Sequence, residues 1–272
     1  MAKKVKDPNN EMSFLEHLEE LRWNIIRSAF AIVVLAVVAF ICKELLFDGI
    51  IIKPSTPDFW TNRMFSKAAD FLKTDGLRIN TEPLQLINYD MAGQFSVHIW
   101  VSLIAGFILA FPYVIFEIWR FISPALYENE RKYSSGAVFY ICLLFIVGVL
   151  FGYYLIVPLS IDFLTGWRIS PDVPNQIRII SYMTTVASVT LASGVVFELP
   201  IFIYFLSKIG LVTPKTLRYY RRHAYVGLLC ISTIITPPDV FSQIMVCIPL
   251  ILLYEVGIFI AKRVEKQQEA ED

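Results

Sequence analysis

Acidic side chains interrupt an otherwise apolar chain at three places. Glu19 and Glu20 come directly before the apolar run WNIIRSAFAIVVLAVVAFIC, and Glu128 and Glu130 lie in a polar segment between two later apolar runs. Glu198 stands inside an apolar run, in GVVFELP. Two carboxylates held apart, such as Glu20 and Glu130, can each accept a planar arginine guanidinium through two parallel hydrogen bonds. This chemistry favours a peptide with paired arginines over one with paired lysines.

The residues alone leave a plainer interpretation open for each acid. Glu20 also fits a solvated surface acid, paired with Arg27, and Glu130 also fits a solvated charged turn with Arg131. An acid inside an apolar run is costly, so Glu198 is by default a functional-site hypothesis, either protonated or hydrated from a concave cavity.

The sequence contains no motif for hydrolytic, nucleotide or metal chemistry. GxxxxGK[ST], HExxH and GxSxG do not occur, so we predict that the chain is not an enzyme. The four cysteines each stand alone in or beside an apolar run, which predicts neither a disulfide framework nor a metal site. We expect no cofactor, and the net charge of zero gives no indication of a nucleic-acid partner.

The apolar runs that surround these acids are long enough to cross a membrane. Apolar residues make up 56% of the 272 residues and charged residues 18%, whereas globular chains have about 25% charged residues. A spanning helix needs roughly 20 apolar residues. We therefore predict a single all-α, polytopic membrane domain over residues 1–272, with six spans at residues 23–42, 94–118, 135–157, 181–206, 223–235 and 241–261.

The distribution of basic residues predicts the orientation. Of the 24 lysines and arginines, 16 fall in residues 1–27, 120–134, 207–222 and the tail 262–272, which six spans would place on one side. Cytoplasmic loops carry the excess of basic residues, so both termini are predicted to be cytoplasmic.

Two further segments have distinct patterns. The outer loop 43–93 contains WTNRMFSKAADFLK, whose apolar residues recur at helical spacing. This helix could lie on the membrane surface, cap the spans or pack on its own loop. The fifth predicted span would cover only about 20 Å, which favours local thinning of the bilayer or a partner helix that Thr233, Thr236 and Gln243 could hydrogen-bond.

Four segments, FLEHLEELR, FISPALYENERK, GVVFELP and TPPDVFSQ, resemble in order and spacing those of the TatC family, the core receptor subunits of the twin-arginine protein translocase. The resemblance covers essentially the whole chain. It implies six helices in a curved, glove-like arrangement in the bacterial cytoplasmic (inner) membrane. It also implies binding of twin-arginine signal peptides at the cytoplasmic face. Folded proteins would then be exported with single-span TatA- and TatB-type partners, in a homo-oligomeric complex that uses the proton-motive force.

The resemblance also assigns residues. It implies that Glu20 and Glu130 are the acids that bind the signal peptide, and that Glu198 is a membrane-embedded polar group. The supporting signal-peptide residues would be Leu21, Arg22, Phe121, Pro124, Leu126, Tyr127 and Arg131. The surface for partner helices would include Thr233, Thr236, Asp239 and Gln243.

The chain departs from the family pattern at some positions. The first outer loop is longer, Glu19 and Glu128 are additional acids, and Glu117 stands where an uncharged polar residue is expected. We assign Glu117 no role. Two other classes of protein were weighed: an ion-coupled transporter with Glu198 as its proton site, and an intramembrane enzyme. The absence of an obvious repeat and the four ordered segments favour the translocase receptor over both.

Overall fold

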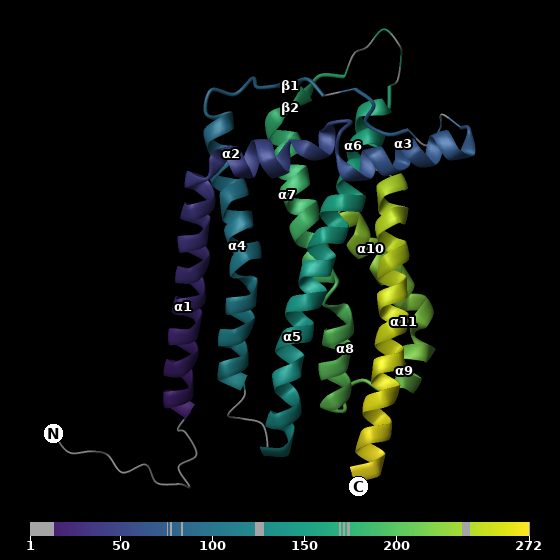
Figure 1. Ribbon diagram of the computed structural model, residues 1–272. Helices are drawn as coiled ribbons and strands as arrows, with labels where there is room; N and C mark the ends of the chain where they lie inside the picture. The colour runs from purple at the N-terminus through teal and green to yellow at the C-terminus, as the bar shows by residue number, and fades with distance from the viewer. Residues whose placement is uncertain are drawn as a thin grey trace, which may run out of the picture.

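The computed structural model describes residues 14–271, except 75, 77, 83, 123–127, 169, 171, 173–174 and 236–239. Long helices run side by side along one axis, and shorter elements cross their upper end (Figure 1). The long helices and their continuations are α1 (Phe14–Ile41), α4 (Gly93–Ile122), α5 (Glu128–Phe151), α6 (Val157–Gly166), α7 (Ile179–Val196), α8 (Leu199–Lys208), α10 (Arg221–Ile235) and α11 (Val240–Glu271).

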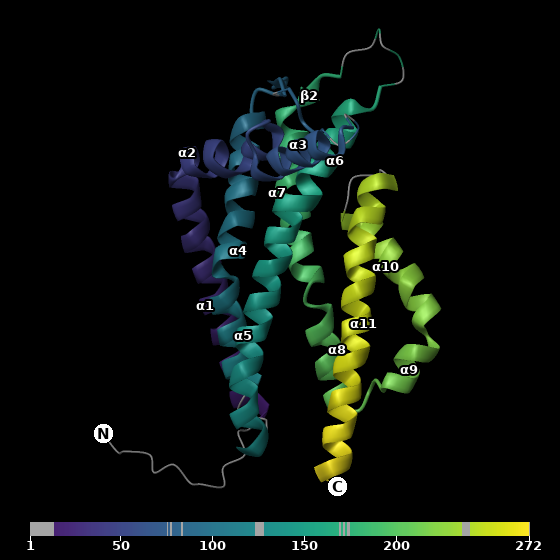
Figure 2. The ribbon, with the colours of Figure 1, turned by 45° about the vertical axis from the view of Figure 1, so that its right-hand side comes forward.

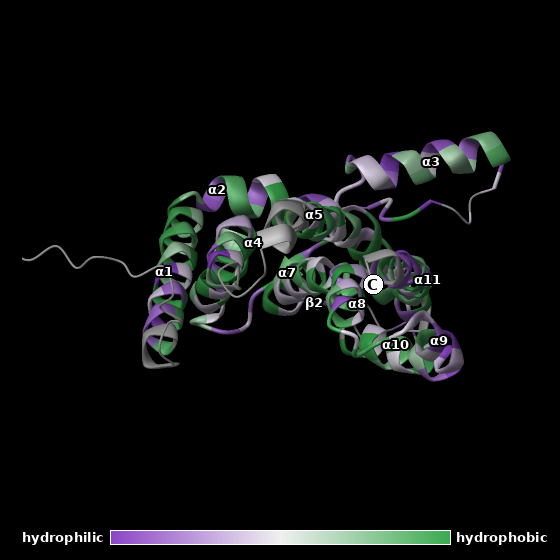
Figure 3. Ribbon diagram, turned by 90° about the horizontal axis from the view of Figure 1, so that it is seen from below, coloured by the Kyte–Doolittle hydropathy of each residue, from purple (hydrophilic) through white to green (hydrophobic). Residues whose placement is uncertain are grey.

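Five helical segments of the described chain are long and apolar enough to cross a membrane, which confirms five of the six predicted spans. They are Leu18–Ile41, Gly93–Phe121, Val138–Gly166, Ile179–Lys208 and Gln243–Gln268. The fifth prediction, residues 223–235, forms the helix α10, but its 15 residues fall short of a usual span. A span at residues 223–235, the sixth in number, therefore stays a prediction. Apolar residues dominate the helices when the bundle is seen from below (Figure 3).

Small residues let neighbouring spans approach closely. A Cβ added at Gly106 of α4 would lie 2.5 Å from the backbone nitrogen of Ala36 in α1. A Cβ at Gly148 of α5 would lie 2.6 Å from the Cβ of Phe197, and one at Gly152 would lie 2.7 Å from the Oγ of Ser193. Without a hydrophobic driving force between helices in lipid, such close contacts supply much of the packing energy.

Two prolines coincide with irregular backbone, as their lack of an N–H predicts. Pro158 opens α6 directly after a π-helical segment, η5 (Gly152–Ile156), so that α5, η5 and α6 form one continuous rod. Pro200 follows the break between α7 and α8, where Glu198 precedes the first residue of α8. Pro112 and Pro249 lie inside unbroken helices. The predicted fourth span is thus two helices rather than one.

The predicted helix in the first outer loop is confirmed as α3 (Trp60–Leu72). It follows α2 (Lys43–Leu46), η1 (Phe47–Ile51) and η2 (Lys53–Ser55), and these elements lie across the upper end of the spans (Figure 1). Two short parallel strands, β1 (Leu86–Ile87) and β2 (Ile177–Arg178), tie this loop to the segment before α7.

A buried asparagine pair holds this upper cap together. The Asn62 side-chain amide donates to the carbonyls of Pro54 at 3.1 Å and Thr56 at 2.7 Å. The Asn80 amide donates to the side-chain oxygen of Asn62 at 3.3 Å and to the Pro158 carbonyl at 2.9 Å. Both asparagines are buried, so their polar groups are satisfied by protein rather than by water.

The first described residue of α1 and the last of α11 lie at the same end of the bundle, the lower end in Figure 1. This agrees with the predicted placement of both termini on one side. Which side of the membrane that is remains a prediction. A short helix, α9 (Pro214–Tyr219), also lies toward this end and leads into α10, which stands at the edge of the bundle beside α11 (Figure 2).

Candidate functional site

Three helices bring the predicted peptide-binding residues toward the lower end. Glu20, Leu21 and Arg22 lie near the start of α1, where Glu20 and Leu21 are half-buried and Arg22 is exposed. Phe121 lies in the last turn of α4 and is half-buried. α5 begins at the same end (Figure 1), so Glu130 belongs to its first turn.

Several predicted residues cannot be followed further. Pro124, Leu126 and Tyr127 lie outside the described residues, and only the backbone of Glu130 and Arg131 is described. The structure therefore brings the helices that carry Glu20 and Glu130 to one end of the bundle, without defining the distance between the two carboxylates.

A polar cluster that the sequence did not predict lies about two turns deeper, between α1 and α4. The Glu117 carboxylate is only 4% exposed and lies 3.9 Å from the Arg27 guanidinium, measured from Oε2 to Nη1. The Tyr113 hydroxyl donates to the other Glu117 oxygen at 2.7 Å. Arg27 is thus paired with Glu117, and the alternative pairing with Glu20 was wrong. The i, i+4 spacing of Tyr113 and Glu117 was the available signal.

This cluster contains unsatisfied polar atoms. Oε2 of Glu117 and the side-chain nitrogen of Asn24, also buried, make no hydrogen bond among the described residues. Asn24 lies one turn after Glu20 on α1. Buried polar groups usually have partners, so α1 and α4 together offer unused hydrogen-bonding capacity near the predicted peptide-binding residues.

Glu198 lies in the break between α7 and α8. Its backbone N–H donates to the Val195 carbonyl at 3.1 Å, and its carbonyl accepts from Ile201 and Phe202 at 3.0 Å each. Oε1 of its side chain is buried and makes no hydrogen bond in the described part of the chain. The structure thus confirms an acid within a spanning segment, at a point of irregular backbone.

In the α10–α11 hairpin, two of the residues predicted to contact a partner helix bond each other. The Gln243 amide donates to the Thr233 hydroxyl at 2.5 Å, and the Thr233 hydroxyl donates to the Leu229 carbonyl at 2.9 Å. Thr236 and Asp239 lie outside the described residues. Lower down, Arg221 pairs with Glu255 of α11 at 2.5 Å, and the Tyr225 hydroxyl donates to the same carboxylate. These bonds hold the short helix α10 against α11.

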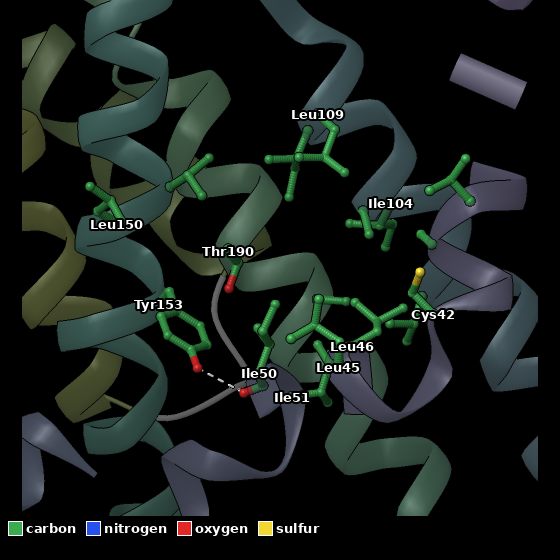
Figure 4. A pocket seen from close by; sticks show the side chains of 17 residues that line it. Cys42, Leu45, Leu46, Ile50, Ile51, Ile104, Leu109, Leu150, Tyr153 and Thr190 are labelled. Carbon is green, nitrogen blue, oxygen red and sulfur yellow. Dashed lines mark hydrogen bonds between the residues drawn. The ribbon is translucent and has the colours of Figure 1, made fainter. Parts of the chain in front are cut away.

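An apolar pocket of about 360 Å³ lies below the cap, between α1, α4, α5 and α7 (Figure 4). Its lining is almost wholly aliphatic, and the Tyr153 hydroxyl at its edge donates to the Ile50 carbonyl at 2.8 Å. Such a hollow suits an apolar segment or an acyl chain better than a polar ligand. The labelled lining residues are Cys42, Leu45, Leu46, Ile50, Ile51, Ile104, Leu109, Leu150, Tyr153 and Thr190.

Fold and sites define a multi-pass membrane protein with polar groups at one end of its helices, an acid at a helix break and an apolar hollow. No group of His, Cys, Asp or Glu that could hold a metal ion occurs within the described residues. Comparison with known proteins gives the family. Residues 16–249 match the family model described as Sec-independent protein translocase protein (TatC). The chain belongs to the TatC family.

Individual relatives agree over nearly the full length. The chain is 40% identical to TatC of Blattabacterium sp. subsp. Periplaneta americana, over 97% of this chain and 100% of the relative. It is 34% identical to TatCy of Bacillus subtilis, over 93% of this chain and 90% of the relative. A crystal structure described as the twin arginine translocase receptor TatC superposes with a TM-score of 0.67 at 32% identity, over 92% of this chain and all of that one.

Proposed function

We propose that this chain is the receptor component of a twin-arginine translocase in a bacterial cytoplasmic membrane. In this role it binds twin-arginine signal peptides at the cytoplasmic, lower end of the bundle. The observation that carries the proposal is the membership in the TatC family, whose relatives are named Sec-independent translocase proteins and whose solved structure is described as a receptor.

The recognition chemistry follows from the acids at the lower end. Glu20, half-buried on α1, and Glu130, in the first turn of α5, are the acceptors for the two arginines. A guanidinium presents a planar fork that matches a carboxylate, whereas a lysine ammonium offers one point of contact. Glu19 and Glu128 add negative charge without selecting arginine. Leu21, Arg22 and Phe121 flank the first acid on α1 and α4, and Pro124, Leu126, Tyr127 and Arg131 complete the proposed site.

The cluster of Arg27, Tyr113 and Glu117, in which only the Glu117 side chain is buried, positions this site. It joins α1 to α4 about two turns from Glu20 and keeps Arg27 from neutralising that acid. The apolar pocket below the cap accommodates the apolar core of the signal peptide, because its lining is aliphatic and opens between the helices that carry the acids.

Partner subunits of the TatA and TatB type dock at the α10–α11 hairpin, in a complex with several copies of this chain. Helix α10 is short, so the bilayer beside it is thinned or covered by a partner helix. Thr233 and Gln243 satisfy each other in the isolated chain and exchange this bond for one with the partner, together with Thr236 and Asp239. The proton-motive force drives export, and Glu198 responds to it from within the span.

An export assay tests the proposal. A bacterial strain without its own TatC-type protein is given this chain with its TatA- and TatB-type partners and a folded reporter. We expect export when the reporter carries an Arg-Arg signal peptide, retention when it carries Lys-Lys, and loss of export when the proton-motive force is collapsed. Retention of the Arg-Arg reporter, although the chain is inserted and co-purifies with its partners, would contradict the proposal.

A further inference from the structure

Helix α3 carries its apolar and polar residues on unexpected sides. Trp60 is 61% exposed, Met64 50% and Phe71 87%, whereas Thr61 and Asn62 on the same helix are buried. In a helix on the surface of a water-soluble protein, the apolar stripe faces the core and the polar face meets solvent. The reversed pattern is typical of a helix whose exposed side meets an apolar medium.

The polar side of α3 is committed to the protein, so the apolar side cannot turn inward. Asn62 donates to two loop carbonyls and accepts from Asn80, and the Thr61 hydroxyl donates to the Tyr154 carbonyl of η5. Rotation of α3 to bury Trp60 would break this buried network, and each orphaned buried group would then be destabilising.

The contact with η5 also fixes the depth of α3 in the membrane. The apolar span that contains η5 runs at least from Val138, where the continuously described part of α5 begins, and continues beyond the contact to Gly166. Tyr154 lies 16 residues after Val138, which corresponds to about 24 Å along a helix. The hydrocarbon core is about 30 Å thick, so the first turn of α3 lies close to its outer boundary rather than above the membrane.

Aromatic side chains gather at this contact. The rings of Phe59 and Tyr154 stack with centroids 5.4 Å apart, and the Trp60 ring meets Tyr154 at 5.9 Å. Tryptophan and tyrosine are enriched where membrane meets water. On the rod below, the exposed side chains of Ile146 and Val147 add apolar surface nearer the bilayer centre. Beyond this contact α3 extends past the edge of the bundle (Figure 3).

We infer that α3 is an interfacial helix, whose face of Trp60, Met64, Phe71 and Leu72 is seated in the outer leaflet of the membrane. The ligand class is the boundary between phospholipid headgroups and acyl chains. The basic side chains Arg63 and Lys67 are exposed beside this face, Lys67 about two turns after Trp60, and their long stems let the charges reach the headgroups. This anchors the cap laterally, beyond the support that the spans provide, and goes beyond the proposed receptor role.

Photolabelling of the wild-type chain tests the inference without any change of sequence. The chain is placed in nanodiscs that hold a single copy, with phosphatidylcholine and a phosphatidylcholine that carries a diazirine near the glycerol end of its acyl chain. After irradiation, adducts are assigned to residues by fragmentation of proteolytic peptides. We expect adducts on Trp60, Met64 and Phe71 at levels similar to those on Val147, and few on Arg63.

Two matched double variants test which side chains of α3 hold it in the membrane. M64Q/F71Q should lower the labelling of Trp60 and Leu72, whereas R63Q/K67Q, with the same number of changes at exposed basic positions, should leave it unchanged. Hydroxyl-radical footprinting of the same nanodiscs reports water contact. If Trp60, Met64 and Phe71 are not labelled by the lipid but are modified by hydroxyl radicals, α3 lies clear of the bilayer. Residues reached by neither probe would indicate that protein covers the face, and either result would overturn the inference.

Discussion

The ion pair between Arg27 and Glu117 predicts an unequal response to its two neutralising substitutions. The Arg27 side chain is 46% exposed and the Glu117 side chain 4% exposed. Arg27→Gln would therefore leave a buried carboxylate with Tyr113 as its remaining partner, whereas Glu117→Gln would leave a half-exposed arginine whose long side chain can extend toward the nearby lower end of the span. Removal of one partner from a buried pair is more destabilising than removal of both, because an uncompensated buried charge remains.

The magnitude follows from the geometry. Two unit charges about 4 Å apart attract by about 4 kcal/mol at an effective dielectric constant of about 20. The 3.9 Å separation is long for a hydrogen bond and the arginine is half exposed, so the net effect is smaller. We expect Arg27→Gln to lower the free energy of unfolding by about 2 kcal/mol and Glu117→Gln by about 1 kcal/mol or less. The double variant should be more stable than Arg27→Gln alone.

Unfolding by sodium dodecyl sulfate in mixed micelles measures these differences for all four proteins of the cycle. The free energy of unfolding is obtained from the midpoint and slope of each transition, and the coupling energy from the cycle. Equal destabilisation by both single variants, or strict additivity in the double variant, would refute the reasoning. Arg27 would then be a side chain that lies near Glu117 without a stabilising interaction.

Three other predictions rest on separate contacts. Gly148→Val should lower the free energy of unfolding by about 1–3 kcal/mol, because the added side chain meets Phe197 and the backbone of α7. The control Gly227→Ala, in open space on α10, should be neutral or stabilising. Equal effects of the two substitutions would refute the proposed close packing. Asn62→Ala should lower the free energy of unfolding by about 2 kcal/mol, because buried carbonyls of the cap lose their donor. The thermal midpoint measures this loss, and an unchanged midpoint would contradict the network. Glu198→Ala should reduce export of an Arg-Arg reporter at normal levels of inserted chain, and normal export would show that the acid has no role.

The spans were predictable because their signal is local. Twenty or so apolar residues in succession define a helix in lipid whatever its neighbours are, so α1 and α11 were located within a few residues at their upper ends. The break at Glu198 was only hinted at by Pro200, since Pro112 and Pro249 lie in helices that continue. Whether a proline breaks a helix depends on what else satisfies the freed carbonyl, which a sequence does not state.

Contacts between distant segments were not predictable in the same way. Arg27 and Glu117 are separated by 90 residues, and only the packing of α1 on α4 brings them together. The helical period of α3 was visible in the sequence, but the face that turns toward the protein was not. The buried network that orients the helix joins Asn62 to Asn80 and Pro158. For the predicted acids Glu20 and Glu130, the sequence gives a role but the structure does not give the distance between them. Their family resemblance assigns them a role, while their mutual geometry is not defined by the described residues.

Peptide binding to the purified chain tests the central claim most directly. Signal peptides with Arg-Arg and with Lys-Lys are titrated against the wild-type chain, Glu20→Gln and Glu130→Gln, with the neighbouring acids Glu19→Gln and Glu128→Gln as matched controls. Recognition by Glu20 and Glu130 predicts a preference of about tenfold or more for Arg-Arg. The preference should be lost in Glu20→Gln and Glu130→Gln and kept in both controls. Equal binding of the two peptides by the wild-type chain, or the same loss in all four variants, would contradict it.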